Sequence, residues 1–532
     1  MGKKNSKLFI IILILALVVV LGIVLYLGTR VNIIQTNEVS LSDLNVEYTK
    51  SELSGEFSSY TAKITLSDSK VQIEGSGVAS SGNTITINSA GTYYITGTIS
   101  DGTIQIDAGK ESDVQLVLDN VNITSKNTSV INGIKANKLT ITLAENSVNT
   151  VTDSSKYTAF TDTEKSEPDA CIFSKTDLVI NGSGKLIINA NYKDGIVSKD
   201  GLKIINSELQ ITSADDAIRG KDYVAINNGN ITINSKADGI KSTNDTDTSL
   251  GYVLIDSGNI NINAGDDGIH ANTKIVINGG NININKSYEG IESAYIEING
   301  GTINVVASDD GINICGGNDG SAMKNSFANL TNSDRKLVIN GGTIKVNANG
   351  DGLDANGSIY INGGDIIVAG PTSNGNGPLD YDGECVVTGG NIIVYGSTGM
   401  WQNESTNSTQ YALAYKVSGN IGDEVVLRDS SGNLVTSFKT EKTYQGIMIS
   451  NSKIENGKTY TLYINGSENA SLTVDGIVTT NGLQSSGMMP GGFGQGGMKQ
   501  NGEMPQNMQL PNGEIPNGIN KENGKINKFM IE

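Results

Sequence analysis

Apolar and polar residues alternate along most of this chain in short runs that end at glycine, asparagine or aspartate. Stretches such as "NTITIN" (83–88) and "VQLVLDNVNIT" (114–124) place β-branched or aliphatic residues at nearly every second position. Alternation with a period of two predicts short β-strands, and the small polar residues between the runs predict tight turns. The pattern therefore indicates an all-β fold.

From about residue 130 the short runs repeat at a regular interval, usually of 21 or 22 residues. Each copy begins with an acidic residue, then Gly or Ala, and then Ile or Leu. The leading acids are Asp194, Asp216, Asp238, Asp267, Glu289, Asp310 and Asp351. A propeller blade needs about 40 residues, whereas about 22 residues make one coil of a parallel β-helix. We therefore expect a solenoid whose inward apolar side chains stack from coil to coil.

The N-terminus has a different character. Lys3, Lys4 and Lys7 precede residues 8–27, which are almost continuously apolar. Twenty such residues make a helix about 30 Å long, which is enough to cross a bilayer. We expect an uncleaved, single-pass membrane anchor whose lysines stay inside, with residues 30–532 extracellular. A cleaved signal peptide on a secreted protein is the alternative.

Changes in pattern divide the chain into five parts. The repeat register disappears after Trp401, where an alternating segment predicts a small antiparallel sheet, and the last residues are rich in Gly, Pro, Met, Asn and Gln. That last composition is typical of disordered, low-complexity sequence. The predicted parts are a transmembrane helix (1–29), a linker (30–59), the β-helix (60–400), a small β-domain or cap (401–480) and a disordered tail (481–532).

Composition excludes several classes of function. The net charge is −18 and the pI is about 4.6, so nucleic acid, which needs a basic surface, is not an expected partner. Cys171, Cys315 and Cys385 are too few and too far apart for a disulfide framework or a zinc site. His270 is the only histidine, and we give it no role.

The repeated acids suggest a cation site. Stacked coils lie about 4.8 Å apart, so the leading acids would form a column of mutually repelling carboxylates. Calcium would relieve this repulsion, because it takes about six to eight oxygen ligands from carboxylates and turn carbonyls. The alternative is that Asp-Gly is simply a good turn sequence, in which the aspartate bonds to its own backbone.

Three copies carry a doubled acid, although a turn needs only one, and an inserted loop adds two further aspartates. We therefore predict bound Ca²⁺ and assign no catalytic residue. The candidate metal ligands are Asp215, Asp216, Asp238, Asp245, Asp247, Asp266, Asp267, Glu289, Asp309, Asp310 and Asp351.

Basic and aromatic residues leave two alternatives open. A cation near the acids could remove the proton alpha to a uronate carboxylate while Ca²⁺ stabilises the charge, or could simply form ion pairs. The candidates are Arg219, Lys221, Lys241, Lys274 and Lys286. Sugar-stacking candidates, equally well explained as packing residues, are Tyr93, Tyr94, Tyr381, Tyr395 and Trp401. No residue is singled out for carbohydrate binding.

An ordered set of motifs accompanies the repeats. It comprises "NTITINSAGTYYITGTISDGTIQIDA" (83–108), "DVQLVLDNVNIT" (113–124), "LTITLAENSVNTVTD" (139–153), the "DGI…INGG" coils to about residue 395 and "NSKIENGKTYTLYING" (451–466). With these motifs, residues 60–470 resemble a family of bacterial surface carbohydrate-binding proteins first described from a cellulolytic clostridium.

The resemblance implies a right-handed, single-stranded parallel β-helix similar to that of pectate lyases, with bound Ca²⁺. It also implies binding of cellulose and of acidic polysaccharides such as polygalacturonate, without cleavage. We therefore expect a membrane-anchored, calcium-stabilised, extracellular protein whose partners are polysaccharide and the membrane. The alternatives are a calcium-dependent polysaccharide lyase and a structural surface stalk or adhesin.

Overall fold

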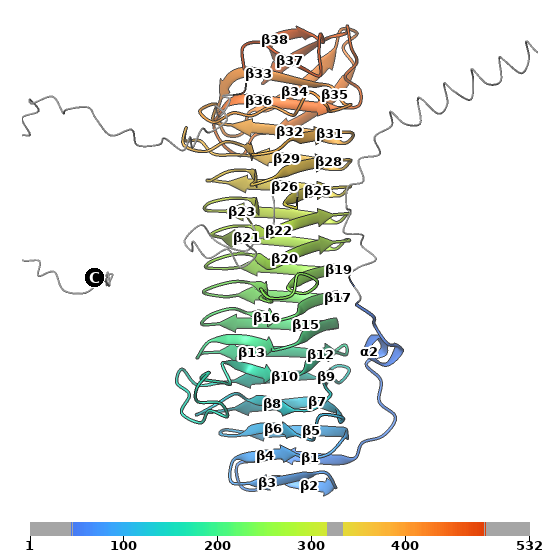
Figure 1. Ribbon diagram of the computed structural model, residues 1–532, viewed down its shortest axis with the longest axis vertical. Coiled ribbons are helices and arrows are strands. Elements are labelled where there is room, and N and C mark those ends of the chain that lie inside the picture. Colours follow the sequence, from blue (N-terminus) through green and yellow to red (C-terminus); the bar gives the residue numbers. More distant parts are fainter. Residues whose placement is uncertain (1–43, 45, 316–333, 484, 486–532) are drawn as a thin grey trace, which may run out of the picture. The chain divides into compact units, whose positions relative to one another are not determined.

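The computed structural model describes residues 44, 46–315, 334–483 and 485 (Figure 1). The chain forms successive coils, and each strand pairs in parallel with the equivalent strand of the next coil. Within one coil the chain runs through three faces, which we call face 1, face 2 and face 3 in chain order. The acidic repeat lies at the turn that leads into face 1.

The strands of face 1 are short. They are β4 (Thr84–Ile87), β6 (Thr103–Asp107), β8 (Ile131–Lys135), β11 (Ala170–Ser174), β14 (Asp194–Ser198), β16 (Ile218–Gly220), β18 (Ile240–Ser242), the first parts of β20 (Ile269–Ile277) and β22 (Ile291–Ile298), then β24 (Ile312–Ile314), β27 (Leu353–Ala355) and β30 (Leu379–Tyr381).

Face 2 contains β1 (Ala62–Leu66), β9 (Lys138–Leu143), β12 (Asp177–Asn181), β25 (Lys336–Ile339), β28 (Ser358–Ile361), β31 (Cys385–Val387) and the last parts of β20 and β22. Face 3 contains β10 (Val148–Thr152), β13 (Lys185–Ala190), β21 (Asn281–Ser287), β23 (Thr302–Ala307), β26 (Thr343–Ala348), β29 (Asp365–Ala369) and β32 (Asn391–Gly396). Long strands run from face 2 into face 3; they are β5 (Gly91–Ile99), β7 (Asp113–Thr124), β15 (Gly201–Ser213), β17 (Tyr223–Asn234) and β19 (Tyr252–Asn263).

Alternating residues of every face point inward and stack in rows. One row on face 2 joins Ile204, Ile226, Ile255, Ile277 and Ile298 as partners in successive coils, and all five are fully buried. Burial of each such side chain contributes roughly 2 kcal/mol of hydrophobic stabilisation. The alternating pattern of the sequence is therefore the pattern of the core.

An Asn-Gly-Gly turn leads from face 2 to face 3 in several coils. Its second glycine has a left-handed backbone, with φ of +98° at Gly280 and +95° at Gly301. A Cβ atom at Gly301 would lie 2.8 Å from the carbonyl oxygen of Gly280 in the coil before it. Both the conformation and the close stacking therefore require glycine.

The corner between faces 1 and 2 accommodates extra residues. After β18 the chain leaves the coil and returns at Gly251, whose N–H donates to the carbonyl oxygen of Asp222 at 2.6 Å. The N–H of Thr273 then bonds to the carbonyl oxygen of Gly251 at 3.0 Å. The pairing of β17 with β19 therefore continues past an inserted loop.

Antiparallel strands flank the parallel coils. Near the N-terminal end, β2 (Gln72–Gly75) pairs with β1, and β3 (Val78–Ser81) pairs with β4. After the last coil, β36 (Tyr444–Asn451) pairs with β32 and with β33 (Ala412–Gly419), which also pairs with β39 (Val478–Thr480). A separate four-stranded sheet follows, made of β34 (Glu424–Asp429), β35 (Leu434–Lys439), β37 (Thr459–Ile464) and β38 (Ser467–Thr473).

The fold class expected from the sequence is wrong as stated. In place of a β-helix bounded by a transmembrane helix and a separate cap, one mainly parallel 35-stranded sheet curls around the core. The reason is that long strands such as β17 carry the hydrogen bonding from one face into the next. The sheet also takes in β33, β36 and β39 from the segment expected to be a cap.

The predicted membrane localisation is also corrected. Among the described residues, no helix is long and apolar enough to cross a bilayer, and α2 spans only Lys50–Ser54. The predicted anchor, residues 8–27, lies outside the described residues, as does almost all of the predicted tail. Single-pass membrane anchoring is therefore not supported.

The segment that holds α2 packs against the sheet. Glu52 is 3% exposed and its carboxylate contacts Lys138 of β9 at 3.1 Å and Lys203 of β15 at 3.3 Å. Its backbone oxygen accepts from Nδ2 of Asn181 on β12 at 2.9 Å. In the same segment, the hydroxyl of Tyr48 donates to the carboxylate of Asp256 on β19 at 2.9 Å. Residues 48–52 thus contact strands of four different coils.

Candidate functional site

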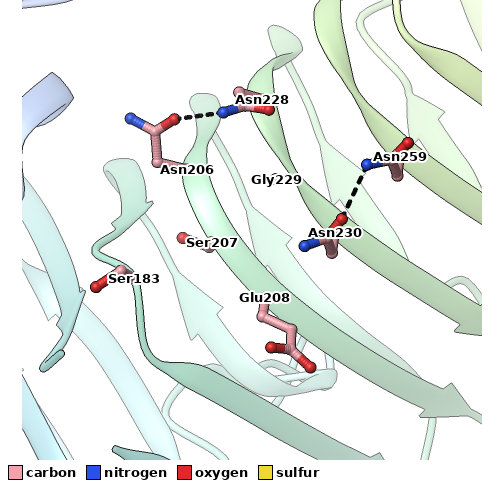
Figure 2. A pocket seen from close by; sticks show the side chains of 8 residues that line it. All are labelled: Ser183, Asn206, Ser207, Glu208, Asn228, Gly229, Asn230 and Asn259. Carbon is pink, nitrogen blue, oxygen red and sulfur yellow. Dashed lines mark hydrogen bonds between the residues drawn. The ribbon is translucent and has the colours of Figure 1, made fainter. Parts of the chain in front are cut away.

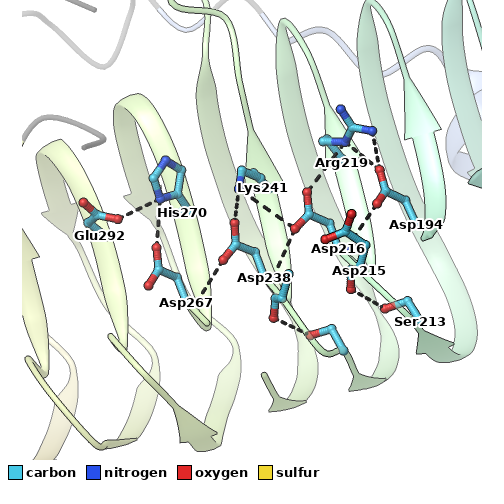
Figure 3. Close-up of polar contacts among 12 residues, drawn as sticks. Asp194, Ser213, Asp215, Asp216, Arg219, Asp238, Lys241, Asp267, His270 and Glu292 are labelled. Carbon is cyan, nitrogen blue, oxygen red and sulfur yellow. Dashed lines mark hydrogen bonds and ion pairs between the residues drawn. The ribbon is translucent and has the colours of Figure 1, made fainter. Parts of the chain in front are cut away.

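The repeated acids form a ladder along the entrance to face 1 (Figure 3). For Asp194, Asp216, Asp238 and Asp310, one carboxylate oxygen accepts a hydrogen bond from the backbone N–H of the leading acid of the next coil. The distances from backbone N to carboxylate Oδ1 are 3.3 Å for Asp216 to Asp194, 3.1 Å for Asp238 to Asp216, 2.9 Å for Asp267 to Asp238 and 2.6 Å for Asp351 to Asp310. The carboxylate therefore joins one turn to the next, which is a structural reason for its repetition.

The small residue after each acid allows the turns to stack. A Cβ atom at Gly239 would lie 2.5 Å from the carbonyl oxygen of Gly268 in the next coil. The N–H of Gly239 also donates to the carbonyl oxygen of Asp267 at 2.8 Å. Larger side chains would push the coils apart, so the Asp-Gly-Ile motif combines a ladder acid with close packing.

A second column lies beside the acids, made of the residue three positions after each one. Arg219, Lys241 and His270 are partners in successive coils. Arg219 contacts both Asp194 and, at 2.8 Å, Asp169; Lys241 contacts Asp238 (Figure 3).

His270 ends the cationic part of this second column. Its Nδ1 atom lies 2.9 Å from Asp267 and 2.8 Å from Glu292 of the next coil. Burial opposes ionisation of Glu292, but the hydrogen bond from His270 and its charge lower the pKa of that carboxyl to about 2. The histidine therefore bridges two carboxylates, as the arginine and lysine before it do, but its second partner lies in the next coil and theirs lie in the preceding coil.

The second column then changes sign. The next residues are Glu292, Asn313 and Asp354, which are again partners in successive coils. Burial first, and then neighbouring carboxylates, raise the pKa of Glu289 to about 9 and that of Asp354 to about 8. This part of the site favours protonated carboxyls because, in the described part of the chain, no lysine or arginine pairs with these acids.

Three groups of side chains could hold a metal ion. Within each group the ligand atoms lie within 4.8 Å of one another: Asp238, Asp267 and His270; Asp267, Glu289 and Glu292; and Asp310, Asp351 and Asp354. The first group already has Lys241 and His270 as counter-charges. The second and third groups offer only carboxylate oxygens, the ligands that calcium prefers, but His270 already contacts Asp267 and Glu292 of the second group. Calcium therefore fits the third group best.

The candidate ligands chosen from the sequence fall into two sets. The structure brings together Asp216, Asp238, Asp267, Glu289, Asp310 and Asp351 in the ladder column. The first acids of the doubled pairs remain partly or fully exposed beside it; they are Asp215, Asp266 and Asp309. Asp245 and Asp247 lie exposed in the inserted loop, where Asp247 accepts from the N–H and hydroxyl of Ser249. That arrangement is an ordinary aspartate turn.

Sequence reasoning included Asp194 among the repeated acids but not among the candidate ligands, and it missed Asp169 and Asp354. It gave His270 no role and offered ion pairing for Arg219 and Lys241 as one of two alternatives. The signal was present in the repeat, because the fourth residue of each copy from Asp216 onward reads Arg, Lys, His, Glu, Asn and Asp in order. The aromatic candidates Tyr93, Tyr395 and Trp401 are fully buried and cannot stack on a sugar.

Two of the basic candidates, Lys241 and Arg219, are held in their protonated forms. Burial alone would lower the pKa of Lys241, but Asp238 and Asp216 raise it above its usual value. The same balance, with Asp194 and Asp169 as partners, raises the pKa of Arg219. Lys274 is buried on face 2, with its Nζ atom 4.9 Å from the ring centre of Tyr295. A general base must be neutral before it accepts a proton, so these cations are poorly suited to that role.

A shallow hollow of about 300 Å³ lies at the corner of faces 2 and 3 (Figure 2). Its lining is polar and mostly uncharged: Ser183, Asn206, Ser207, Glu208, Asn228, Gly229, Asn230 and Asn259. Two pairs of asparagines are hydrogen bonded across successive coils there, Asn228 to Asn206 at 2.9 Å and Asn259 to Asn230 at 3.0 Å. The site combines fixed amide groups with open access.

Comparisons with known proteins show a family match over part of the chain. Residues 81–325 match the model of a family described as carbohydrate-binding domain-containing proteins. A protein of that description from Acetivibrio thermocellus is 38% identical over 151 residues, which cover 28% of this chain and 52% of the relative. The chain thus spans about half the length of that curated relative.

Among solved structures, a polysaccharide lyase-like protein from C. thermocellum, determined as a gadolinium derivative, is 34% identical. The match covers 45% of this chain and 92% of that protein, with a TM-score of 0.41. The family-model match and the curated relative confirm, over the residues they match, the family resemblance read from the sequence.

Proposed function

Because residues 81–325 match the carbohydrate-binding domain family model, we propose that this protein binds polysaccharide and does not cleave it. The absence of cleavage is proposed because the basic side chains beside the acids are held in ion pairs. Arg219 contacts three carboxylates, and Lys241 contacts two. A lyase needs a base free to take a proton from the substrate, and these side chains are held as ion-pair partners.

Calcium is part of the proposal. Asp310, Asp351 and Asp354 would hold the ion, and Asn313 lies in the same column with a buried Oδ1 atom that has no hydrogen-bond partner. The ion would supply the positive charge that the second column lacks beyond His270. Its expected effect is to stabilise the folded coils, because a ligand that binds only the folded state shifts the unfolding equilibrium.

The test uses the full chain with polygalacturonate and with cellulose, in calcium and in chelator. Retention on a polymer and the ultraviolet absorbance of unsaturated chain ends are followed together. We expect retention with flat absorbance. Rising absorbance would identify a lyase, and absence of retention on every polymer would contradict carbohydrate binding.

The calcium proposal is tested separately by thermal unfolding. Calcium is expected to raise the Tm of the wild type and of a Asp245→Asn/Asp247→Asn control. The same addition should leave the Tm of Asp351→Asn/Asp354→Asn unchanged. An equal rise in both double variants would place the ion elsewhere, and no rise in the wild type would remove calcium from the proposal.

A further inference from the structure

We propose that the carbohydrate lies on face 3, along an uncharged surface that we call the amide face, and that it is a neutral, extended polysaccharide. The amide face consists of the outward side chains, at alternate positions, of residues 230–234, 259–263, 281–283 and 302–304. These belong to β17, β19, β21 and β23, which pair in sequence. The inference rests on the proposed function and names the surface and the substrate class.

The outward side chains of the amide face are asparagine and threonine only, and they form ordered ladders. Asn283 donates from Nδ2 to Asn261 at 3.2 Å, and Asn304 donates to Asn283 at 2.8 Å. A parallel ladder joins Asn263 to Asn234 at 2.9 Å. The side chains of a ladder are therefore held in one orientation.

Each ladder bond uses one N–H of an amide group and one lone pair of its partner. An asparagine has two amide N–H donors and a carbonyl oxygen that accepts twice. Each rung thus keeps donors and acceptors that can meet the hydroxyl groups of a sugar. Little side-chain freedom remains to be lost on binding, which reduces the entropic cost of association.

The spacing and the charge of the amide face select the ligand. Its rungs repeat about every 4.8 Å, so they match an extended polymer better than a compact sugar. The chain carries a net charge of −18, yet these positions hold no ionisable side chain. An acidic polymer would be repelled by the protein as a whole, whereas a neutral one meets only amides and hydroxyls.

The other faces of the same coils are less suitable. On face 2, outward Ala225, Leu254 and Val276 form a small apolar cluster with Leu44, Val46 and Tyr48 of the N-terminal segment. The entrance to face 1 carries the charged columns. The exposed charged residues Glu208, Lys286 and Lys345 of face 3 lie outside the amide face, whose own side chains are uncharged, polar and exposed or half-buried. The hollow of Figure 2 continues the amide face on the N-terminal side through Asn230 and Asn259.

The experiment measures the Kd of the full chain for a soluble neutral β-glucan and its retention on microcrystalline cellulose and on polygalacturonate. The test variant is Asn261→Ala/Asn283→Ala/Asn304→Ala, and the single variant Asn283→Asp adds a negative charge and removes the N–H that donates to Asn261. The matched control is Asn278→Ala/Asn299→Ala/Asn340→Ala, which removes the same number of ladder asparagines from the turn outside the amide face.

We expect both amide-face variants to weaken neutral-glucan binding at least tenfold while the control binds like the wild type. If the triple variant fails to fold, Asn283→Asp alone decides the question. Equal binding by all variants would overturn the amide face and leave the proposed function standing, as would a wild type that binds only polygalacturonate. A wild type that binds no polymer would overturn the proposed function itself.

Discussion

The backbone N–H of Asp267 donates to the carboxylate of Asp238 at 2.9 Å, although the two residues are 29 positions apart. The other oxygen of Asp238 contacts Lys241, so one side chain connects two coils and balances its charge. The same arrangement recurs at Asp216. The repeated acid therefore has a structural role, which is to join successive coils.

Replacement of Asp238 with alanine should destabilise the protein strongly. The change leaves Lys241 partly buried with a weakened ion pair and removes the acceptor for the N–H of Asp267. Loss of one partner from a buried ion pair costs about 3–5 kcal/mol, and the partial exposure of Lys241 points to the lower end. Chemical denaturation should show this loss, with a smaller one in Asp238→Asn. Asp247→Ala, in the exposed loop, is the control, and an equal loss there would contradict the ladder.

The acids that have no lysine or arginine partner among the described residues should make the stability of the fold fall as the pH rises. The pKa of Glu289 is raised to about 9, that of Asp354 to about 8 and that of Asp310 to about 7, so folded carboxyls keep protons that unfolded carboxyls release above about pH 4. Their contribution to stability is therefore full below pH 4 and is lost as the pH rises toward 8 or 9. In chelator, the Tm should fall between pH 5 and pH 8. Asp354→Asn should flatten that slope, and an unchanged slope would contradict this account.

Removal of the Glu52 carboxylate should detach the N-terminal segment. Glu52→Ala removes the contacts to Lys138 and Lys203 and the capping bond to the N–H of Thr49, with an expected cost of about 2–4 kcal/mol. Hydrogen exchange at residues 46–54 should become faster than in the wild type. Exposed Glu56→Ala should leave it unchanged; similar exchange in both variants would show that the carboxylate does not hold the segment.

The Asn-Gly-Gly turns should tolerate no side chain. Gly301→Ala combines a left-handed backbone, which costs roughly 1–2 kcal/mol, with a contact of 2.8 Å to the preceding coil. Gly466→Ala is the matched control, because its φ of +78° is also left-handed but no atom lies within 4 Å of an added Cβ. Thermal unfolding should show the larger loss for Gly301→Ala. Equal losses would mean that coil spacing adjusts freely.

The sequence predicted which residues lie above one another, because a fixed period decides that. Asp216, Asp238 and Asp267 lie in successive coils as their spacing indicates, and Trp401 is buried as expected of a packing residue. The sequence alone did not predict how the charges are balanced. That balance depends on the side chains of Arg219 and Lys241, which form ion pairs with acids of their own and the preceding coil. Because the prediction considered only repulsion between carboxylates, it assigned their neutralisation to calcium. In the first half of the column, Arg219 and Lys241 neutralise them instead.

The repeat pattern also did not predict where the sheet ends. β33, β36 and β39 have no repeat signature, yet they continue the hydrogen bonding of β32. Strand pairing at the last coil is decided by which backbone groups remain open, and alternation of side chains carries no information on that point.

Extra residues inserted at the corner between faces 1 and 2 do not change the register in which successive coils pair. Both long intervals between repeats fall at this corner, after β18 and after β24, and pairing resumes beyond each of them. A duplication or a foreign loop placed there would alter the surface without moving a core residue. The protein therefore has a built-in position at which new recognition loops can be gained in evolution, or grafted by design, while the ladder and the amide face stay in place.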